Sequence, residues 1–335
     1  MIHNRIIFPV GQGGFAYERI ENYVVIYDCG SHSSMSSVES FIDDVSMRID
    51  HVDLLFISHF DKDHVSGLRY LLSHLRVRTA VVPWIASELK MAYGMYTNGS
   101  YSAIESILRE NDVEVVEIRE EGNEQHQFTF QDLWEWVAKS MMTAADFESV
   151  KLYMQKLGLD LTALTSDVVY LEKEKDNINA AFKAVFGAKG PNTKGLVMLS
   201  QRCKNSPLRA KIMMRGCPHC MGFFQLIDYI DKTSCLYVGD ADLKNRGCKR
   251  MVQNFLIRYK CDEPLLMMQI PHHGSQYNIG VNFEKDFPSL FYFVNDIDTK
   301  RLQKSACLFK SLTKQKKLLV SRDVCHDTIV TKAGV

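Results

Sequence analysis

The stretch Ser58-His59-Phe60-Asp61-Lys62-Asp63-His64 decides how the rest of this chain is interpreted. It directly follows the run Val52-Asp53-Leu54-Leu55-Phe56-Ile57, whose apolar character predicts a buried strand. Two histidines and two aspartates would be held there by a rigid sheet and exposed by a loop. Imidazole and carboxylate groups are common metal ligands, so the stretch predicts a hydrolytic metal site at the end of a strand.

Two later apolar runs end in the same kinds of side chain. The run 235–238 leads to Asp240, and the run 265–270 leads to His272 and His273. A ligand set rich in carboxylate suits Zn²⁺ or Mn²⁺ and differs from a structural zinc site, which prefers cysteine. Each segment alone is weak, but together they predict metal binding. The candidate ligands are His59, Asp61, Asp63, His64, Asp240, His272 and His273.

The pattern around this cluster is that of an α/β protein. Apolar positions after His64 recur at three- and four-residue spacing, which predicts a helix directly behind the cluster. Segments 79–84 and 113–118 are typical of strands, and 101–110 is typical of a helix. Near the beginning, Gly11-Gln12-Gly13-Gly14 lacks the Gly-Lys-Ser/Thr ending of a phosphate-binding loop, so a tight hairpin turn is favoured.

The strand pattern fades between about 119 and 191. This charged, methionine-containing region favours helices, which we expect over 132–142, 144–157 and 179–186. A mostly helical insertion of this kind would serve as a lid or as a substrate wall. No repeat or long linker separates independent units, so the simplest expectation is a single domain over 1–335 that carries the insertion.

Composition excludes few classes of protein. The 335 residues include 40 Lys plus Arg and 40 Asp plus Glu, so no overall positive field attracts nucleic acid or an anionic membrane. No apolar run reaches the roughly 18 to 20 residues that span a bilayer, so we expect a cytoplasmic protein without a membrane partner. Nine cysteines without regular spacing predict reduced thiols, the isolated Cys217-Pro218-His219-Cys220 included. The composition indicates no oligomeric state.

The motifs together resemble those of a known family. Ser58 to His64 is similar to the signature of the metallo-β-lactamase fold, and Asp61, where most members have a second histidine, resembles the hydrolase domain of the DNA-uptake competence (ComEC-type) proteins. Pro271-His272-His273-Gly274-Ser275 is similar to the late motif of that subgroup. Tyr237-Val238-Gly239-Asp240 and Tyr27-Asp28-Cys29-Gly30 resemble two further family motifs.

This resemblance implies a four-layer αββα sandwich with the metals at one edge of two facing sheets. Asp63, His64 and one late histidine would hold one ion, His59 and Asp61 another, and Asp240 would bridge them. Whether His272 or His273 is the ligand stays open. Many relatives supply a further histidine that the segment 192–200 lacks. We therefore expect two ions, Zn²⁺ or Mn²⁺, with one position partly occupied.

The expected reaction is hydrolysis of a phosphodiester in DNA, RNA or a smaller nucleotide. A pair of bound ions makes hydroxide available from water near neutral pH and stabilises charge on phosphoryl oxygens. Asp63 would be both a ligand and the group that positions the water, and the spare late histidine, His272 or His273, would protonate the leaving oxygen. Hydrolysis of a thioester, lactone or lactam is one alternative. A non-catalytic binding or regulatory module with a degenerate site is the other.

Overall fold

The computed structural model describes residues 2–8, 10–119, 127–206, 209–215, 226–230, 232–260, 263–294, 308, 311–312, 314–315, 318–320 and 328–334. The pair Cys217 and Cys220, predicted to be incidental thiols, lies outside these residues. Within them, no helix is long and apolar enough to cross a membrane.

The core is built on two mixed sheets. The first has nine strands in the order β11-β10-β16-β1-β2-β3-β4-β5-β6, and the second has seven in the order β15-β14-β13-β12-β9-β8-β7. The strands of the first sheet are β1 (Ile2–Ile7), β2 (Phe15–Ile20), β3 (Tyr23–Cys29), β4 (His51–Phe56), β5 (Arg76–Pro83), β6 (Glu114–Ile118), β10 (Arg209–Arg215), β11 (Leu226–Ile230) and β16 (Thr328–Gly334). Those of the second are β7 (Gln127–Phe130), β8 (Trp134–Ser140), β9 (Leu196–Arg202), β12 (Cys235–Tyr237), β13 (Leu265–Gln269), β14 (Ser289–Val294) and β15 (Leu318–Val320).

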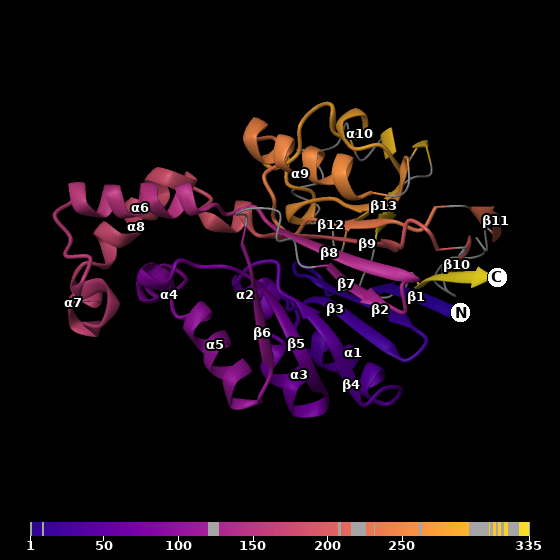
Figure 1. Ribbon diagram of the computed structural model, residues 1–335, viewed down its shortest axis with the longest axis horizontal. Helices are drawn as coiled ribbons and strands as arrows, with labels where there is room; N and C mark the ends of the chain where they lie inside the picture. The colour runs from indigo at the N-terminus through magenta and orange to yellow at the C-terminus, as the bar shows by residue number, and fades with distance from the viewer. Residues whose placement is uncertain are drawn as a thin grey trace.

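Helices cover the outer faces of both sheets (Figure 1). The first sheet is covered by α1 (Met35–Ser46), α2 (Lys62–Val65), α3 (Leu68–His74), α4 (Lys90–Tyr96) and α5 (Ser100–Glu110). The second is covered by α9 (Arg246–Tyr259) and α10 (Phe283–Asp286). A third apolar cluster fills the space between the sheets, where Phe56 of β4 contacts the ring of Phe128 of β7. The expected four-layer αββα sandwich is confirmed.

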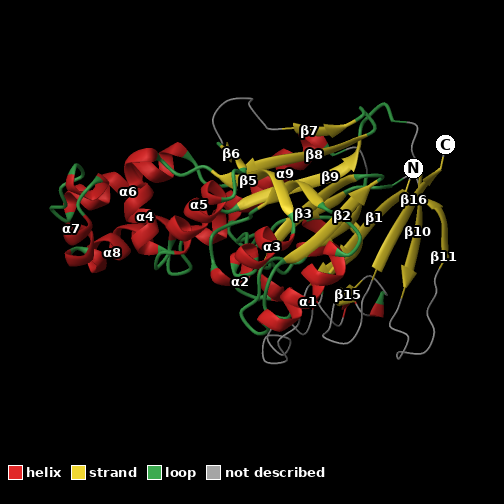
Figure 2. Cartoon of the chain, turned by 90° about the horizontal axis from the view of Figure 1, so that it is seen from below, coloured by secondary structure: helices red, strands yellow, loops and turns green. Residues whose placement is uncertain are grey.

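A helical arm extends from one end of the sandwich. It consists of α6 (Ala144–Lys156), α7 (Val168–Lys173) and α8 (Lys175–Phe186), which Figure 2 shows at the opposite end from β10, β11 and β16. The arm is fixed to the body because α8 packs against α4, where Phe182 contacts the rings of Tyr93 and Tyr96. The described residues also include the short 3₁₀ helices η1 (Ser87–Leu89), η2 (Ala163–Thr165), η3 (Pro191–Lys194) and η4 (His272–Gly274).

The predicted helix over 132–142 is wrong. Residues Trp134–Ser140 form β8, which pairs with β9 along its whole length in antiparallel register. Trp136 faces the space between the sheets, whereas Val137 faces the helices outside. A strand buried on both faces shows no alternation of polar and apolar residues, so its sequence does not distinguish it from a helix. The described helices of the 119–191 region therefore begin only at Ala144.

Candidate metal centre

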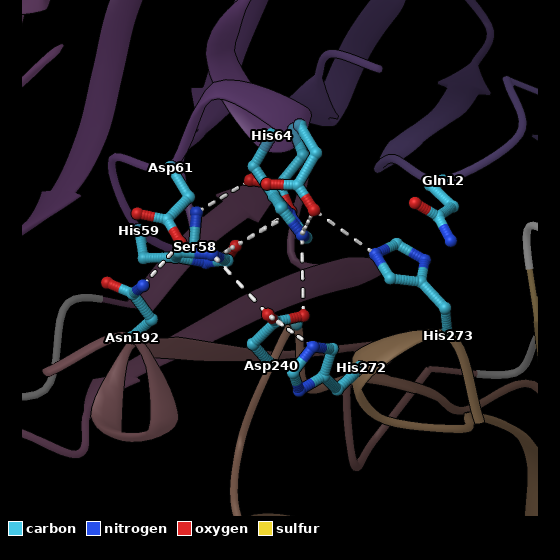
Figure 3. Close-up of polar contacts among 12 residues, drawn as sticks. Gln12, Ser58, His59, Asp61, His64, Asn192, Asp240, His272 and His273 are labelled. Atoms are coloured by element: carbon cyan, nitrogen blue, oxygen red, sulfur yellow. Dashed lines mark hydrogen bonds and ion pairs between the residues drawn. The ribbon is translucent and has the colours of Figure 1, made fainter. Parts of the chain in front are cut away.

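The candidate ligands lie at the carboxyl ends of strands from both sheets. His59 and Asp61 follow β4, and α2 presents Asp63 and His64 immediately afterwards. Asp240 follows β12, and the late histidines lie in η4, directly after β13. Figure 3 shows the side chains of the first sheet, among them His59 and His64, directed toward those of the second, among them Asp240. The geometry explains why segments roughly two hundred residues apart share one site, since both sheets end at this edge.

The polar atoms of six of the seven candidates form three overlapping groups. These are His59 with His64 and Asp240, Asp63 with His64 and His273, and His59 with Asp61 and Asp63, each with its atoms within 4.8 Å of one another. His273 Nε2 lies 3.3 Å from Asp63 Oδ2. His64 Nε2 lies 3.4 Å from Asp240 Oδ1 and 3.9 Å from Asp63 Oδ2. Such spacing matches donor atoms that share cations.

Three atoms at the centre are buried without a hydrogen bond among the described residues. They are His59 Nε2, His64 Nε2 and Asp240 Oδ1, on side chains no more than 8% exposed. Burial of unpaired polar atoms is costly unless something else satisfies them. A divalent cation satisfies imidazole nitrogen and carboxylate oxygen together. The residues present therefore fit the expected metal.

Asp28 orients the two histidines of the signature stretch. Its carboxylate accepts hydrogen bonds from the Ser58 backbone N–H and hydroxyl, each at 2.7 Å, and lies 2.7 Å from His64 Nδ1. The Ser58 hydroxyl is in turn 2.9 Å from His59 Nδ1. Occupying Nδ1 of both rings leaves Nε2 for the centre, as in carboxylate–histidine–metal arrangements. The sequence identified Asp28 only as part of a family motif and assigned it no role.

The glycine-rich turn near the N-terminus lies against the same loop. It joins β1 to β2, as predicted, and Gly14 N–H donates to Asp63 O at 3.1 Å. A Cβ on Gly13 would lie 2.1 Å from Gly30 O, and one on Gly14 would lie 2.9 Å from His64 Nδ1. Only glycine allows this approach, so the turn supports Asp63 and His64 from behind. Figure 3 places Gln12, from the same turn, beside His273.

Charges within the centre shift its pKa values in opposite directions. Burial alone would lower the pKa of His64, but the carboxylates of Asp28 and Asp63 hold it well above the usual range. Burial alone would raise the pKa of Asp240, yet the neighbouring His64 and His59 hold it well below. Burial does raise the pKa of Asp61. A cation would replace the proton on His64 and would favour ionised Asp61, so the electrostatics also suit a metal.

The two late histidines occupy different environments. His273 is 6% exposed and joins the group formed with Asp63 and His64. His272 is 29% exposed, its Nε2 is 3.7 Å from Asp240 Oδ2, and its Nδ1 is 3.1 Å from Asn278 Oδ1. Both have left-handed backbone, with φ of 48° and 49°, a strain that recurs at functional sites. His272 is thus the one candidate outside the three groups.

Two amides support the candidate ligands, and the sequence assigned neither of them a role. Asn192 donates a hydrogen bond from Nδ2 to Asp61 Oδ2. Asn278 is fully buried and donates from Nδ2 to Asp240 O at 2.8 Å while its Oδ1 faces His272. Asn192 begins a segment that loosely resembles a family motif, whereas Asn278 is an isolated asparagine with no distinguishing pattern. Only their tertiary contacts reveal them.

Comparison with known proteins finds a family match for part of this chain. Residues 15–134 match the family model described as Metallo-beta-lactamase superfamily. The cleavage and polyadenylation specificity factor subunit 3 of Dictyostelium discoideum is 31% identical over 114 residues, which are 32% of this chain and 14% of that protein. The chain thus matches only a small part of that relative's length.

Two solved structures are similar over nearly the whole chain. The short form of human tRNase Z shows 9% identity and a TM-score of 0.46, with 99% of this chain and 100% of that one covered. The metallo-β-lactamase fold protein YhfI from Bacillus subtilis shows 7% identity and a TM-score of 0.44, with 100% of both chains covered. Residues 15–134 thus match the metallo-β-lactamase superfamily, and the chain has the four-layer arrangement of the metallo-β-lactamase fold.

Proposed function

We propose that this protein is a metal-dependent phosphodiester hydrolase that acts on nucleic acid or on a nucleotide. The observation that carries the proposal is the convergence of three carboxylates and three imidazoles, with buried ligand atoms left unpaired among the described residues. A centre this rich in carboxylate suits two cations held close together, an arrangement that recurs in phosphatases and nucleases. The ions would be Zn²⁺ or Mn²⁺.

The residues divide into two positions that share one carboxylate. Asp63, His64 and His273 would hold one ion, His59 and Asp61 would hold the other, and Asp240 would contact both. When bound, such ions supply hydroxide from water near neutral pH and stabilise charge on phosphoryl oxygens. Asp63 would also orient the attacking water through its remaining oxygen.

His272 would serve as the acid for the leaving oxygen. Its Nδ1 faces Asn278 Oδ1, so Nε2 is the atom that can carry a proton to substrate. Because Asn278 also donates to Asp240 O, the ring is fixed relative to the bridging carboxylate. His273, closer to Asp63, would be the ligand of the two.

Three further features support this function and not a lactamase-like one. The order His59-x-Asp61-x-Asp63-His64 resembles the ComEC-type hydrolases of DNA uptake. The partial relative in Dictyostelium discoideum is named for cleavage and polyadenylation. The helical arm and α4 lie at one end of the sandwich, where they would form a substrate wall within one domain over 1–335.

The test is an activity panel on the full chain with Mn²⁺ and with Zn²⁺. Substrates are bis-p-nitrophenyl phosphate, single-stranded DNA, duplex DNA, RNA and cyclic nucleotides, with a thioester and a lactone beside them. We expect metal-dependent turnover of at least one phosphodiester. Asp63→Ala should reduce that turnover by on the order of 10³-fold, because loss of a ligand removes several kcal/mol of transition-state stabilisation.

Two controls make the result decisive. Asp44→Ala removes a half-buried carboxylate of α1, outside the candidate ligand set, and should leave turnover unchanged. His272→Ala should reduce turnover without releasing metal, whereas His273→Ala should release it. Turnover of the thioester or lactone alone would assign the site to a different hydrolase class. Absence of all turnover in a protein that binds no metal would instead indicate a non-catalytic module.

A further inference from the structure

The carboxylate of Asp61 has a surrounding unlike that of Asp63 or Asp240. Asp61 is the residue before α2, yet its side chain makes no capping hydrogen bond to that helix. Its Oδ2 instead accepts a hydrogen bond from Asn192 Nδ2, a residue 131 positions later in the chain. Figure 3 shows the Asn192 amide directed at Asp61 from the side of the centre away from His273. One of the two Asp61 oxygens is therefore engaged by a donor.

Asn192 is held in this place by the backbone of the metal loop. It lies in η3, whose following residues Gly195 and Leu196 run against Ser58. Leu196 N–H donates to Ser58 O at 2.6 Å, and a Cβ on Gly195 would lie 2.4 Å from the same oxygen. Thr193 O also accepts from Asp242 N–H at 3.1 Å. The Asn192 amide thus has a fixed position relative to His59 and Asp61.

The two ion positions consequently differ in their donors. The group of Asp63, His64 and His273 offers two imidazole nitrogens and a carboxylate. The group of His59, Asp61 and Asp63 offers one imidazole, and one of its carboxylates shares its charge with an amide N–H. Imidazole favours Zn²⁺, whereas carboxylate and water suit Mn²⁺ better. Harder donors, one of them partly neutralised by the amide, give weaker binding and a smaller preference for zinc.

We propose that Asn192 is a positioning residue that fixes Asp61 as a single-oxygen donor and makes the His59–Asp61 position the weaker, exchangeable ion site. The chain then loads its ions in order, first at Asp63, His64 and His273 and afterwards at His59 and Asp61. The second position has a smaller ratio of zinc affinity to manganese affinity than the first. This inference rests on the metal centre of the proposed function. It adds that occupancy of the second ion position depends on the concentration of free metal.

The test measures metal binding without substrate. Metal-free full-length protein is titrated with Zn²⁺ and, separately, with Mn²⁺ by calorimetry, and retained metal is counted by mass spectrometry after dialysis. We expect two successive binding steps, the second at least roughly tenfold weaker, as changes in supporting contacts of a metal site typically produce. One Zn²⁺ should survive dialysis and the second should be lost.

Variants of Asn192 assign the difference to this residue. Asn192→His adds an imidazole and should tighten the second Zn²⁺ step by roughly 10- to 100-fold without altering the first. Asn192→Ala returns the second oxygen and the full charge of Asp61 to the ion and should also tighten the second step, by a smaller factor than Asn192→His. The matched control is Asn177→Ala, which removes an amide-to-carboxylate hydrogen bond to Glu174 on the helical arm and should change neither step. Circular dichroism verifies folding of each variant.

Two results would overturn the inference. One is equal affinity at both steps in the unaltered protein. The other is an Asn192→Ala variant, folded as judged by circular dichroism, whose second step is unchanged or whose first step shifts equally. A protein that binds neither ion at all would refute the proposed function itself, so the two failures are distinguishable.

Discussion

Two buried clusters in this molecule contain both histidine and carboxylate side chains, but they differ in how far their polar atoms are hydrogen-bonded. One is the metal centre at the strand ends. The other, here the inter-sheet cluster, lies between the sheets and consists of His3, Arg5, Glu18, Trp134, Trp136, Ser200 and Tyr237. Arg5 Nε donates to Glu18 Oε1 at 2.7 Å, and Ser200 and Tyr237 hydroxyls donate to the same carboxylate at 2.6 Å each.

The two clusters differ in whether their buried polar atoms have hydrogen-bond partners. Glu18 also accepts from Trp136 Nε1 at 3.1 Å, so its two oxygens have partners on strands of both sheets. In the candidate metal centre, His59 Nε2, His64 Nε2 and Asp240 Oδ1 have no hydrogen bond among the described residues and only face one another as charged groups. A saturated polar network specifies structure, whereas an unsaturated one at a sheet edge is prepared for a ligand. The inter-sheet cluster also fixes Tyr237, on the strand that leads to Asp240.

The largest effect should come from breaking the inter-sheet cluster. Glu18→Ala leaves the Arg5 guanidinium buried and unpaired, and we expect a loss of roughly 3–5 kcal/mol in the free energy of unfolding. Urea denaturation measures it. Glu172→Ala, an exposed change on α7, is the control and should stay within about 0.5 kcal/mol. A similar small loss for Glu18→Ala would mean that the cluster does not hold the sheets together.

Adding metal should stabilise the protein through the other cluster. At one hundred times the dissociation constant, a bound ion adds about 2.7 kcal/mol to the free energy of unfolding. Thermal melts with and without Mn²⁺ or Zn²⁺ measure this. Asp63→Ala should abolish the gain, while Glu18→Gln, if destabilised, should still show it. A gain that survived Asp63→Ala would place the ion elsewhere.

Asp28→Asn should weaken metal binding through the contact to His64. Losing the carboxylate removes the charge that orients Nδ1 and supports the ligand, and we expect a roughly 10- to 100-fold lower affinity by calorimetric titration. Asp53→Asn is the counterpart, because Asp53 is a buried carboxylate of β4 that accepts from Val24 N–H, remote from the ligands. It should lower stability and leave metal affinity intact. If Asp28→Asn and Asp53→Asn lowered metal affinity equally, Asp28 would have no specific role in orienting His64.

The smallest predicted effect is a loss of stability at acidic pH. Burial by itself would raise the pKa of Glu18, but Arg5 and the hydrogen-bond donors hold it well below its ordinary value of 4.5. A lowered folded-state pKa adds stability that is complete above 4.5 and is lost as the pH falls below it. Between pH 7 and pH 3.5, this change at Glu18 lowers the free energy of unfolding by about 1.4 kcal/mol.

The difference between the unaltered protein and Glu18→Gln isolates that loss of stability. Measured by urea denaturation at both pH values, the advantage of the glutamate should shrink on acidification. An advantage that grew or stayed constant between pH 7 and 3.5 would contradict the lowered pKa.

Much of the centre was visible in the sequence. The signature stretch, Asp240 and the late histidines each follow an apolar run, and that local rule located all seven candidates. The rule failed at Trp134–Ser140, because a strand buried on both faces has no periodicity of its own and is defined by pairing with β9. It also gave no indication of Asn192, Asn278 or the partners of Glu18, since a single amide or carboxylate has no pattern until the chain folds.

By itself, the sequence determined which residue types end which strands, and hence the α/β layering and the set of candidate ligands. Strand ends are encoded locally, by apolar runs followed by polar loops. Only the tertiary structure decided which ligand atoms stay unpaired, which late histidine approaches Asp63, and that Asn192 engages Asp61. The physical reason is that satisfaction of a buried polar atom depends on neighbours brought from distant segments. Buried carboxylates and histidines are therefore fully hydrogen-bonded in the cluster between the sheets and only partly so at the sheet edge.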